Sequence, residues 1–283
     1  MGFEASVPVK QYDLERDVIV FCGASTSSAF WDTYWARLHR DDLKEKILSG
    51  LSDRAVLRLV QQLVDPMDCI LEGGCGIGQY VYLLHKHGYN VVGLDYAADT
   101  VARSKELFPE LALAVADLRR LPLQDGQIGC YLSFGVIEHF HDGYDRILRE
   151  AHRVLKKGGY LVVTFPQISP LRRMKIRLGC YGDTERGTRH AVHQFYQYAF
   201  PRGSVSENLR EAGFQTVSWK AQNGAKGFYD EAPIIGPIVR RVFRYPGRNV
   251  LTRSIRFLLR LALDNLISAY LCGHTCQLVA RKV

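Results

Sequence analysis

The most constraining feature of this sequence is a short segment in which an apolar pair runs into an acidic residue and then a cluster of glycines. Residues 70–79 read Ile-Leu-Glu-Gly-Gly-Cys-Gly-Ile-Gly-Gln, and a helix-compatible segment continues from Gln79 to His87. Glycine suits a tight turn because it tolerates positive φ and lets a ligand approach the backbone closely. The start of the following helix would offer unpaired N–H groups to an electron-rich ligand. The segment therefore predicts a buried strand, a glycine turn and a helix N-terminus.

The glycine spacing decides between two kinds of ligand site. A dinucleotide fingerprint reads G-x-G-x-x-G, but counting from Gly74 its third glycine position holds Gln79. Counting from Gly73 also fails, because Cys75 holds the second position. The pattern present is E-x-G-x-G-x-G, with Glu72 closing the strand. A glycine run by itself fits an ordinary turn equally well, so the rest of the unit has to decide.

Further apolar segments downstream also end in carboxylates. The segment 89–95 closes on Asp95, roughly 20 residues beyond the glycine turn, where an open α/β sheet places an acid for ribose hydroxyls. The segment 111–116 runs into Asp117, and 127–133 is a fourth apolar segment. These segments predict successive strands whose carboxyl ends carry polar side chains.

Helical spacing separates the last two of these strands. Residues 146–157 place apolar side chains on one helix face and end in Lys-Lys-Gly-Gly, and an apolar segment follows over 160–165. We expect the helix to run to Lys157, with cations in its last turn and a glycine stop. Strands alternating with helices favour a parallel sheet covered on both faces.

On these residues the segment from about 66 to 166 resembles the class I S-adenosylmethionine-dependent methyltransferases, especially the type 11 small-molecule group. The resemblance implies a Rossmann-like α/β fold with a seven-stranded, mostly parallel sheet, and S-adenosyl-L-methionine as cofactor. Asp95 matches the ribose-binding acid, and Asp117 with Leu118 the position that contacts adenine. The implied cofactor-binding residues are Glu72, Gly74, Cys75, Gly76, Gly78, Asp95, Tyr96, Asp117, Leu118 and Ser133. A weaker resemblance continues over 195–217.

Charge raises the question of nucleic acid. The chain of 283 residues carries a formal net charge of +8, which suits either a basic soluble protein or a polyanion-binding one. Basic residues gather at 172–177 and 240–260 without a nucleic-acid-binding signature. After the fourth strand stands Ser133-Phe134-Gly135-Val136 instead of the Asp/Asn-Pro-Pro-aromatic tetrapeptide typical of base-nitrogen methylation. These observations disfavour a nucleic-acid acceptor.

Cysteine usage and the first residues bear on the compartment. Seven cysteines are scattered without a C-x-x-C pair, which predicts a reduced, cytoplasmic protein with no disulfide framework and no structural zinc. Residues 1–5 show no positive region followed by an apolar run, so we expect no signal peptide.

The chain divides into four expected parts of one α/β unit. Residues 1–65 form an N-terminal arm and helical cap, with 1–28 as an extended arm. Residues 66–220 form the cofactor-binding core and include a sixth strand at 215–219. Residues 221–272 form a helical, basic and apolar insert, and 273–283 hold the last strand. The insert is far longer than a hairpin connection requires.

A helix expected over 250–271 has two interpretations. Arg253, Arg256, Arg260 and Asp264 form a narrow polar stripe on an otherwise apolar helix. In the first interpretation the helix packs within the protein or against a second copy, with its stripe in solvent. In the second, residues 234–272 make peripheral contact with the inner membrane surface or with a lipid-like acceptor. The apolar stretches are too short to span a bilayer.

The acceptor side has weaker signals. His139 follows the fourth strand, at the sheet edge where ligands bind, and is the candidate catalytic base; a donor-contacting or structural role is the alternative. The run Glu138-His139-x-His141 is too sparse for a metal site. The candidate substrate-binding residues are Trp31 and Trp35, four apart on one helix face, and His190, His193 and Tyr196.

The sequence thus favours a methyltransferase for a small or lipophilic acceptor, with oxygen acceptors slightly preferred. An RNA methyltransferase is the second hypothesis. A non-catalytic, cofactor-binding partner subunit is the third, because the glycine motif speaks to donor binding and not to acceptor chemistry. Nothing in the sequence indicates the oligomeric state.

Overall fold

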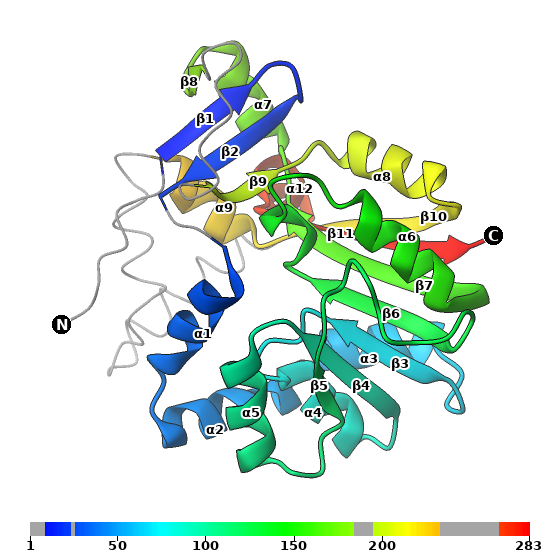
Figure 1. Cartoon of the computed structure of the whole chain (residues 1–283). Coiled ribbons are helices and arrows are strands. Elements are labelled where there is room, and N and C mark those ends of the chain that lie inside the picture. The colour runs from blue at the N-terminus through cyan, green and yellow to red at the C-terminus, as the bar shows by residue number, and fades with distance from the viewer. Residues whose placement is uncertain (1–8, 24–25, 184–194, 233–265) are drawn as a thin grey trace.

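The computed structural model describes residues 9–23, 26–183, 195–232 and 266–283. Its main sheet has seven strands in the order β10-β11-β7-β6-β3-β4-β5 (Figure 1). These strands are β3 (Cys69–Gly73), β4 (Asn90–Asp95), β5 (Leu113–Val115), β6 (Ile128–Phe134), β7 (Leu155–Pro166), β10 (Phe214–Gln222) and β11 (Thr275–Lys282). The pairs among β3, β4, β5, β6 and β7 are parallel, and β11 pairs antiparallel with both β7 and β10. The predicted Rossmann-like sheet is confirmed, with the last strand running opposite to the core.

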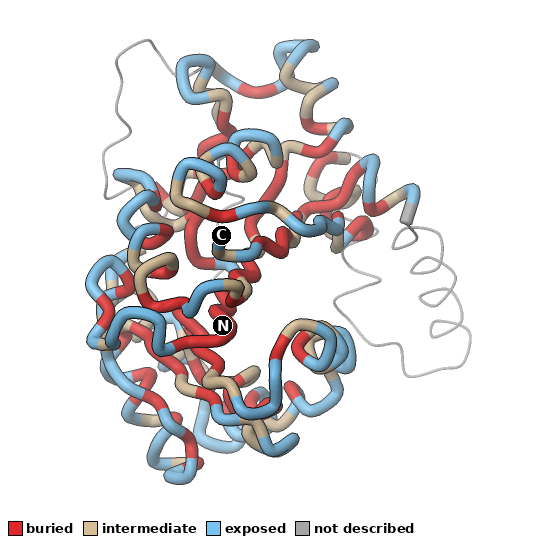
Figure 2. The backbone as a smooth tube through the Cα atoms, turned by 90° about the vertical axis from the view of Figure 1, so that its right-hand side faces the viewer, coloured by how far each residue is buried: buried red, intermediate tan, exposed pale blue. Residues whose placement is uncertain are grey.

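Helices cover the two faces of this sheet. The helices of the described residues are α1 (Ser28–Ala36), α2 (Arg40–Leu48), α3 (Arg54–Leu63), α4 (Gln79–Lys86), α5 (Ala98–Leu107), α6 (Asp145–Val154), α7 (Pro170–Arg177), α8 (Arg202–Glu211), α9 (Gly224–Glu231) and α12 (Leu266–Cys272), with short 3-10 turns at Ser49–Ser52 and Ile137–His139. Alternate residues of one strand face opposite layers: Tyr131 packs with α6 and α8, while Cys130 and Leu132 pack with the layer of α2 to α5. Figure 2 shows the buried positions running through the middle of the molecule, with exposed segments around them.

The structure contains a second, four-stranded sheet that the sequence did not predict. Residues 9–22 are a hairpin of β1 (Val9–Asp13) and β2 (Val18–Cys22), and not an extended arm. It joins β8 (Gly182–Asp183) and β9 (Phe195–Ala199) in the order β8-β1-β2-β9. Strand β2 is buried on both faces, since Val18 and Val20 pack in the main core and Ile19 and Phe21 in a smaller cluster. An uninterrupted apolar run of this kind carries no period-2 pattern that would mark it as a strand.

The end of α6 also differs from expectation. The helix stops at Val154, and Leu155 already belongs to β7, paired with Ile128 of β6. Because the register shifts between Ile128 and Cys130, the Lys-Lys-Gly-Gly run is an irregular start of the strand instead of a helix C-cap. Lys156 donates to Asp68 at 2.6 Å, so it binds the loop before β3 instead of the end of a helix.

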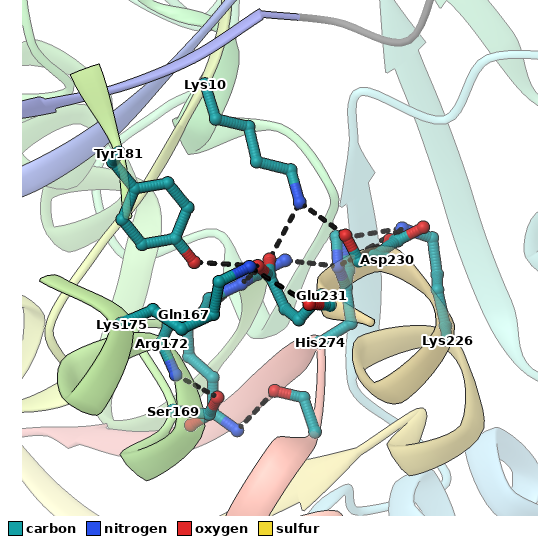
Figure 3. A network of polar contacts seen from close by, with 11 residues as sticks. Lys10, Gln167, Ser169, Arg172, Lys175, Tyr181, Lys226, Asp230, Glu231 and His274 are labelled. Carbon is teal, nitrogen blue, oxygen red and sulfur yellow. Dashed lines mark hydrogen bonds and ion pairs between the residues drawn. The ribbon is translucent and has the colours of Figure 1, made fainter. Parts of the chain in front are cut away.

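A buried polar network joins the small sheet to the main domain (Figure 3). Its centre is the carboxylate of Glu231 on α9, which accepts from Lys10 of β1 at 2.8 Å and from Arg172 of α7 at 2.9 Å. Lys175 and Tyr181 donate to the same carboxylate at 2.8 and 2.7 Å. The surrounding cations hold the pKa of Glu231 at about 2 against its burial. Part of the basic cluster at 172–177 is therefore a buried, paired core and not a polyanion-binding surface.

Part of the insert lies within the described residues, as α9 and α12. The predicted arginine stripe at 253–264 and most of the helix expected over 250–271 lie outside them. Within the part of the chain that the structure describes, no helix has the length and apolar character that crossing a bilayer requires.

Candidate active site

A cavity of about 230 Å³ lies at the edge of the main sheet where β3, β4 and β6 end. The carboxyl ends of parallel strands meet at this edge, which is where open α/β sheets bind ligands. The lining residues are Trp31, Trp35, Glu72, Gly74, Cys75, Gly76, Ile77, Gln79, Tyr80, Asp95, Tyr96, Asp117, Leu118, Arg119, Phe134, Gly135, Val136, His139 and Phe140.

The glycine turn between β3 and α4 forms the floor of the cavity. Gly74 and Gly76 take φ of 78° and 51°, a region that other residues rarely adopt. The amides of Gly74 and Cys75 donate to the carbonyl of Leu94 at 2.7 and 3.1 Å, which holds the turn against the end of β4. A Cβ at Gly74 would lie 2.4 Å from the Val136 side chain. The turn therefore needs glycine for its conformation and for its space.

Asp95 ends β4 beside this turn and is buried. One carboxylate oxygen accepts from the amide of Gly76 at 2.7 Å and the other from the amide of Ala97 at 2.9 Å. Burial raises the pKa of Asp95, and these amides oppose the rise. A carboxylate has about four lone-pair directions, so both oxygens retain capacity for hydroxyl donors such as those of a ribose.

Glu72 is a second acid on the cavity wall. It is buried, and its Oε2 has no hydrogen-bond partner among the described residues. Burial raises its pKa to about 8, with a further rise from the nearby Asp95. A carboxyl oxygen left unpaired in such a place is costly. The ammonium group of a bound amino-acid moiety would pair with it, so the donor set fits S-adenosyl-L-methionine.

The rim of the cavity carries Asp117, Leu118 and Arg119. The Arg119 guanidinium donates to both carboxylate oxygens of Asp117, at 2.7 Å for the shortest contact, and holds the pKa of that carboxyl below its usual range. Tyr96 donates through its hydroxyl to the carbonyl of Thr26 at 2.6 Å. This bond fixes the segment before α1 to the rim.

Helix α1 covers the glycine turn from the N-terminal part of the chain. Ser27 caps it by accepting from the amide of Phe30, and Asp32 accepts from the amide and hydroxyl of Thr100 on α5, both at 2.9 Å. A Cβ at Gly76 would lie 3.5 Å from the Trp35 ring, so this indole lies directly over the turn. The docking of α1 thus closes the cavity with an aromatic wall.

His139 lies between this wall and the small sheet. Its Nδ1 lies 2.8 Å from the carbonyl oxygen of Tyr196, so this nitrogen carries the proton and Nε2 is left as an acceptor. Burial lowers the pKa of the ring to about 4. The rings of Trp31 and Tyr196 pack edge-on against it, at 4.9 and 5.2 Å between centroids. His139 is therefore a neutral, oriented imidazole at physiological pH.

Other predicted site residues either do not line the cavity or lie outside the described residues. Gly78 and Ser133 do not line the cavity: Gly78 precedes α4 with φ of 76°, and Ser133 is buried inside β6. His190 and His193 lie outside the described residues. Among described residues, no group of three or more potential ligands could hold a metal ion.

Several lining residues had not been predicted as site residues: Ile77, Gln79, Tyr80, Arg119, Phe134, Gly135, Val136 and Phe140. Most of them adjoin predicted ones in the sequence, for example Arg119 after Leu118 and Phe140 after His139. Extending each motif by one or two residues would have found all of them except Val136, which lies three residues from both Ser133 and His139.

Comparison with known proteins agrees with this geometry. Residues 71–163 match the family model described as "Methyltransferase domain". A probable S-adenosylmethionine-dependent methyltransferase of Mycolicibacterium smegmatis is 33% identical over 65% of this chain and 60% of its own length. The malonyl-[acyl-carrier protein] O-methyltransferase of Hamiltonella defensa is 26% identical over 44% and 49%. A putative 23S rRNA (guanine-N(1)-)-methyltransferase of Bacillus subtilis is 30% identical over 42% and 40%.

Among solved structures, a putative methyltransferase from Haloferax volcanii, in complex with the Trm112 methyltransferase activator, superimposes with a TM-score of 0.55. That match covers 89% of this chain and 95% of the other at 17% identity, a level that supports the fold alone. The chain spans only 60% of the mycobacterial relative. The family match and the mycobacterial relative identify residues 71–163 as an S-adenosyl-L-methionine-dependent methyltransferase domain, and the Rossmann-like fold agrees with class I of these enzymes.

Proposed function

We propose that the protein transfers a methyl group from S-adenosyl-L-methionine to a small or lipophilic acceptor, with an oxygen acceptor slightly favoured. The observation that carries the proposal is the aromatic wall of the cavity, to which Trp31, Trp35, Tyr80, Phe134 and Phe140 contribute. Such a wall suits an apolar acceptor and excludes water from the transfer.

The residues divide the work of binding between them. When bound, S-adenosyl-L-methionine supplies a methyl group already activated on a sulfonium, so alignment of the acceptor is the main task of the protein. Asp95 would accept from the ribose hydroxyls, and Glu72 would pair with the ammonium group. Leu118 would pack on the adenine, with Asp117 at the rim. These assignments are part of the proposal.

His139 has a role suited to a hydroxyl acceptor. Its Nε2 is an acceptor and its Nδ1 is anchored on the Tyr196 carbonyl, so we assign it to orienting a hydroxyl by accepting its hydrogen bond. The low pKa makes the ring a weak base in the resting site. It takes the proton only as the acceptor oxygen becomes more acidic during transfer. A carboxylate acceptor would need no such step.

Two other functions compete with this one. The Bacillus subtilis relative is named as an rRNA methyltransferase, and the net charge of +8 suits RNA. The Haloferax volcanii neighbour is found with an activator protein, which suits a subunit that needs a partner. The aromatic lining of the cavity favours the small or lipophilic acceptor over both.

The test uses methyl-labelled S-adenosyl-L-methionine, the purified full chain and an extract of the source cells, separated into organic, aqueous small-molecule, RNA and protein fractions. Label in the organic or aqueous small-molecule fraction, absent with Asp95→Ala and retained with the exposed control Asp125→Ala, supports the proposal. Label in RNA overturns it in favour of the RNA acceptor. Absence of label, with cofactor binding intact, favours the partner-subunit function.

A further inference from the structure

One face of the molecule, away from the cavity, exposes an unusual set of large apolar side chains. It is formed by α7, α12 and the edge strand β10, and α12 packs against both of the others. We name it the α7–α12 face and define it by Met174, Arg177, Leu178, Trp219, Ile267, Tyr270 and Leu271. Ile267 is 73% exposed and Leu178 is 69% exposed.

The exposed side chains follow the helix period. On α7 and its C-cap, positions 174, 177 and 178 are spaced i, i+3 and i+4. On α12, positions 267, 270 and 271 have the same spacing. Side chains at this spacing lie on one side of a helix. Single exposed apolar residues are ordinary, but here two helices that pack against each other each expose such a stripe, and extended exposed apolar surfaces mark interaction sites.

A groove of about 440 Å³ runs through this face, and its charged lining residues are all arginines. It is lined by Gln167, Ile168, Pro170, Arg173, Met174, Arg177, Pro201, Arg202, Gly203, Trp219 and Tyr270. Arg202 stacks on Trp219 at 3.6 Å, and Trp219 lies 6.1 Å from Tyr270 between ring centroids. Arg173 is paired with Asp17. Among the described residues that line the groove, none is acidic, so it presents excess positive charge beside apolar helix faces.

We propose that the α7–α12 face docks on an anionic bilayer surface. Exposed aliphatic side chains at helix spacing enter the boundary between headgroups and acyl chains, while Trp and Tyr favour the headgroup level. Arginines at the same level attract anionic lipids. An RNA would use the arginines and aromatic rings but gains nothing comparable from Met174, Leu178, Ile267 and Leu271, since bases stack on planar groups. The aliphatic stripes therefore favour lipid over RNA.

The experiment measures co-sedimentation of the full chain with phosphatidylcholine vesicles that contain either no phosphatidylglycerol or about 40 mol% of it. The expected result is binding to the anionic vesicles only, weakening as NaCl rises from about 0.05 M to about 0.5 M. The triple variant Met174→Ser/Ile267→Ser/Leu271→Ser should lower the partition coefficient at least about tenfold. Its matched control, Leu14→Ser/Met67→Ser/Val115→Ser, removes exposed apolar side chains elsewhere and should bind like the wild type.

A charge variant gives a second readout. Arg177→Gln should lower the partition coefficient about fivefold at low salt, and Arg54→Gln, on α3, should leave it unchanged. Asp95→Ala should bind vesicles normally, so this inference and the proposed methyl transfer can fail independently. Equal binding by the two triple variants overturns the proposal. Binding to a fluorescent RNA oligomer without binding to vesicles also overturns it, in favour of a nucleic-acid surface.

Discussion

The side of the cavity that we assign to the cofactor and the small sheet behind His139 are built in different ways. On the cofactor side, Glu72, Gly74 and Asp95 come from two consecutive strand–turn–helix units, and short backbone bonds between neighbouring strand ends hold them. On the side of the small sheet, the Glu231 network joins segments far apart in the chain: its contact with Lys10 spans 221 positions (Figure 3). The cofactor side is thus a local structure, and the small sheet is joined to the main domain only once distant segments have met.

This difference explains why the cofactor side can be recognised in the sequence and the Glu231 network cannot. A local turn has to satisfy its own backbone geometry, so its residue types and spacing are restricted. A network assembled by long-range contacts requires only that its members be buried and balanced in charge, and it sets no spacing between them in the sequence. Lys10 or Glu231 in the sequence alone could equally be an exposed surface residue.

The largest expected effect is on the long-range side. Glu231→Gln removes the charge that balances Lys10, Arg172 and Lys175 in a buried site, and should lower the free energy of unfolding by about 4 kcal/mol. Chemical denaturation measures the change, and hydrogen exchange should show β1 and β2 losing protection before β3 and β4. Glu207→Gln, which breaks an exposed pair with Arg210, is the control and should change little. Unaltered protection of the β1–β2 hairpin in Glu231→Gln would contradict the account.

The next effect concerns the acids of the cofactor side. Burial raises the pKa of Glu72 from 4.5 to about 8, so the folded protein keeps a proton that the unfolded chain releases. Stability is therefore full below pH 4.5 and is lost as the pH rises toward 8. Between about pH 5.5 and 7.5 this group accounts for about 3 kcal/mol of that loss.

In Glu72→Gln the free energy of unfolding should fall less steeply with pH, because the contribution of Glu72 is absent. Denaturation at a series of pH values measures this dependence. Glu138 also has a pKa raised by burial to about 8, so part of the slope remains in the variant. Identical pH profiles for Glu72→Gln and the wild type would disprove the assignment.

A third, smaller effect isolates the turn. Gly74→Ala places a Cβ against Val136 at a position with φ of 78°. Cofactor affinity should fall by about 2 kcal/mol, or roughly thirtyfold in Kd. Titration calorimetry with S-adenosyl-L-methionine measures it. Gly203→Ala, at a site with open space around the new Cβ, should bind normally; equal loss in both variants would remove the turn from the explanation.

The smallest expected effect concerns His139, which lies between the cavity and Tyr196 of the small sheet. His139→Asn keeps a donor near the Nδ1 position facing the Tyr196 carbonyl but removes the Nε2 acceptor. We expect kcat to fall about tenfold, a modest value for a histidine of low pKa, while Kd for the cofactor stays constant. His139→Gln retains an acceptor near the Nε2 position and should recover part of kcat. A loss of cofactor affinity with unchanged kcat would instead make His139 a donor-contacting residue.

The sequence predicted the core well because its strands have strong signals. The last strand, predicted within 273–283, is β11 (Thr275–Lys282); the helix from Gln79 ends one residue earlier than predicted, at Lys86. The small sheet was missed because β2 is buried on both faces and so lacks alternation. The early end of α6 was missed because pairing of Leu155 with Ile128 overrides the local Lys-Lys-Gly-Gly signal.

In the site, too, the local residues were predicted and the long-range contacts were not. The predicted residues Glu72, Gly74, Cys75, Gly76 and Asp95 come together on the cavity wall, since each lies at the end of a strand or in the turn that follows it. The tautomer and low pKa of His139 depend on Tyr196 and on burial by Trp31, contacts that no spacing rule supplies. Arg172 belonged by sequence to a basic cluster, and its partner Glu231 could be found only in three dimensions.

The most direct test of the account is the affinity of the full chain for S-adenosyl-L-methionine, measured by titration calorimetry for the wild type, Asp95→Ala and the exposed control Asp125→Ala. In the proposed assignment Asp95 accepts charge-assisted hydrogen bonds from the ribose, so Kd for Asp95→Ala should rise by about a hundredfold or more. Asp125→Ala should bind like the wild type. Equal affinity in all three proteins, or no binding by the wild type, would contradict the assignment of this cavity to the cofactor.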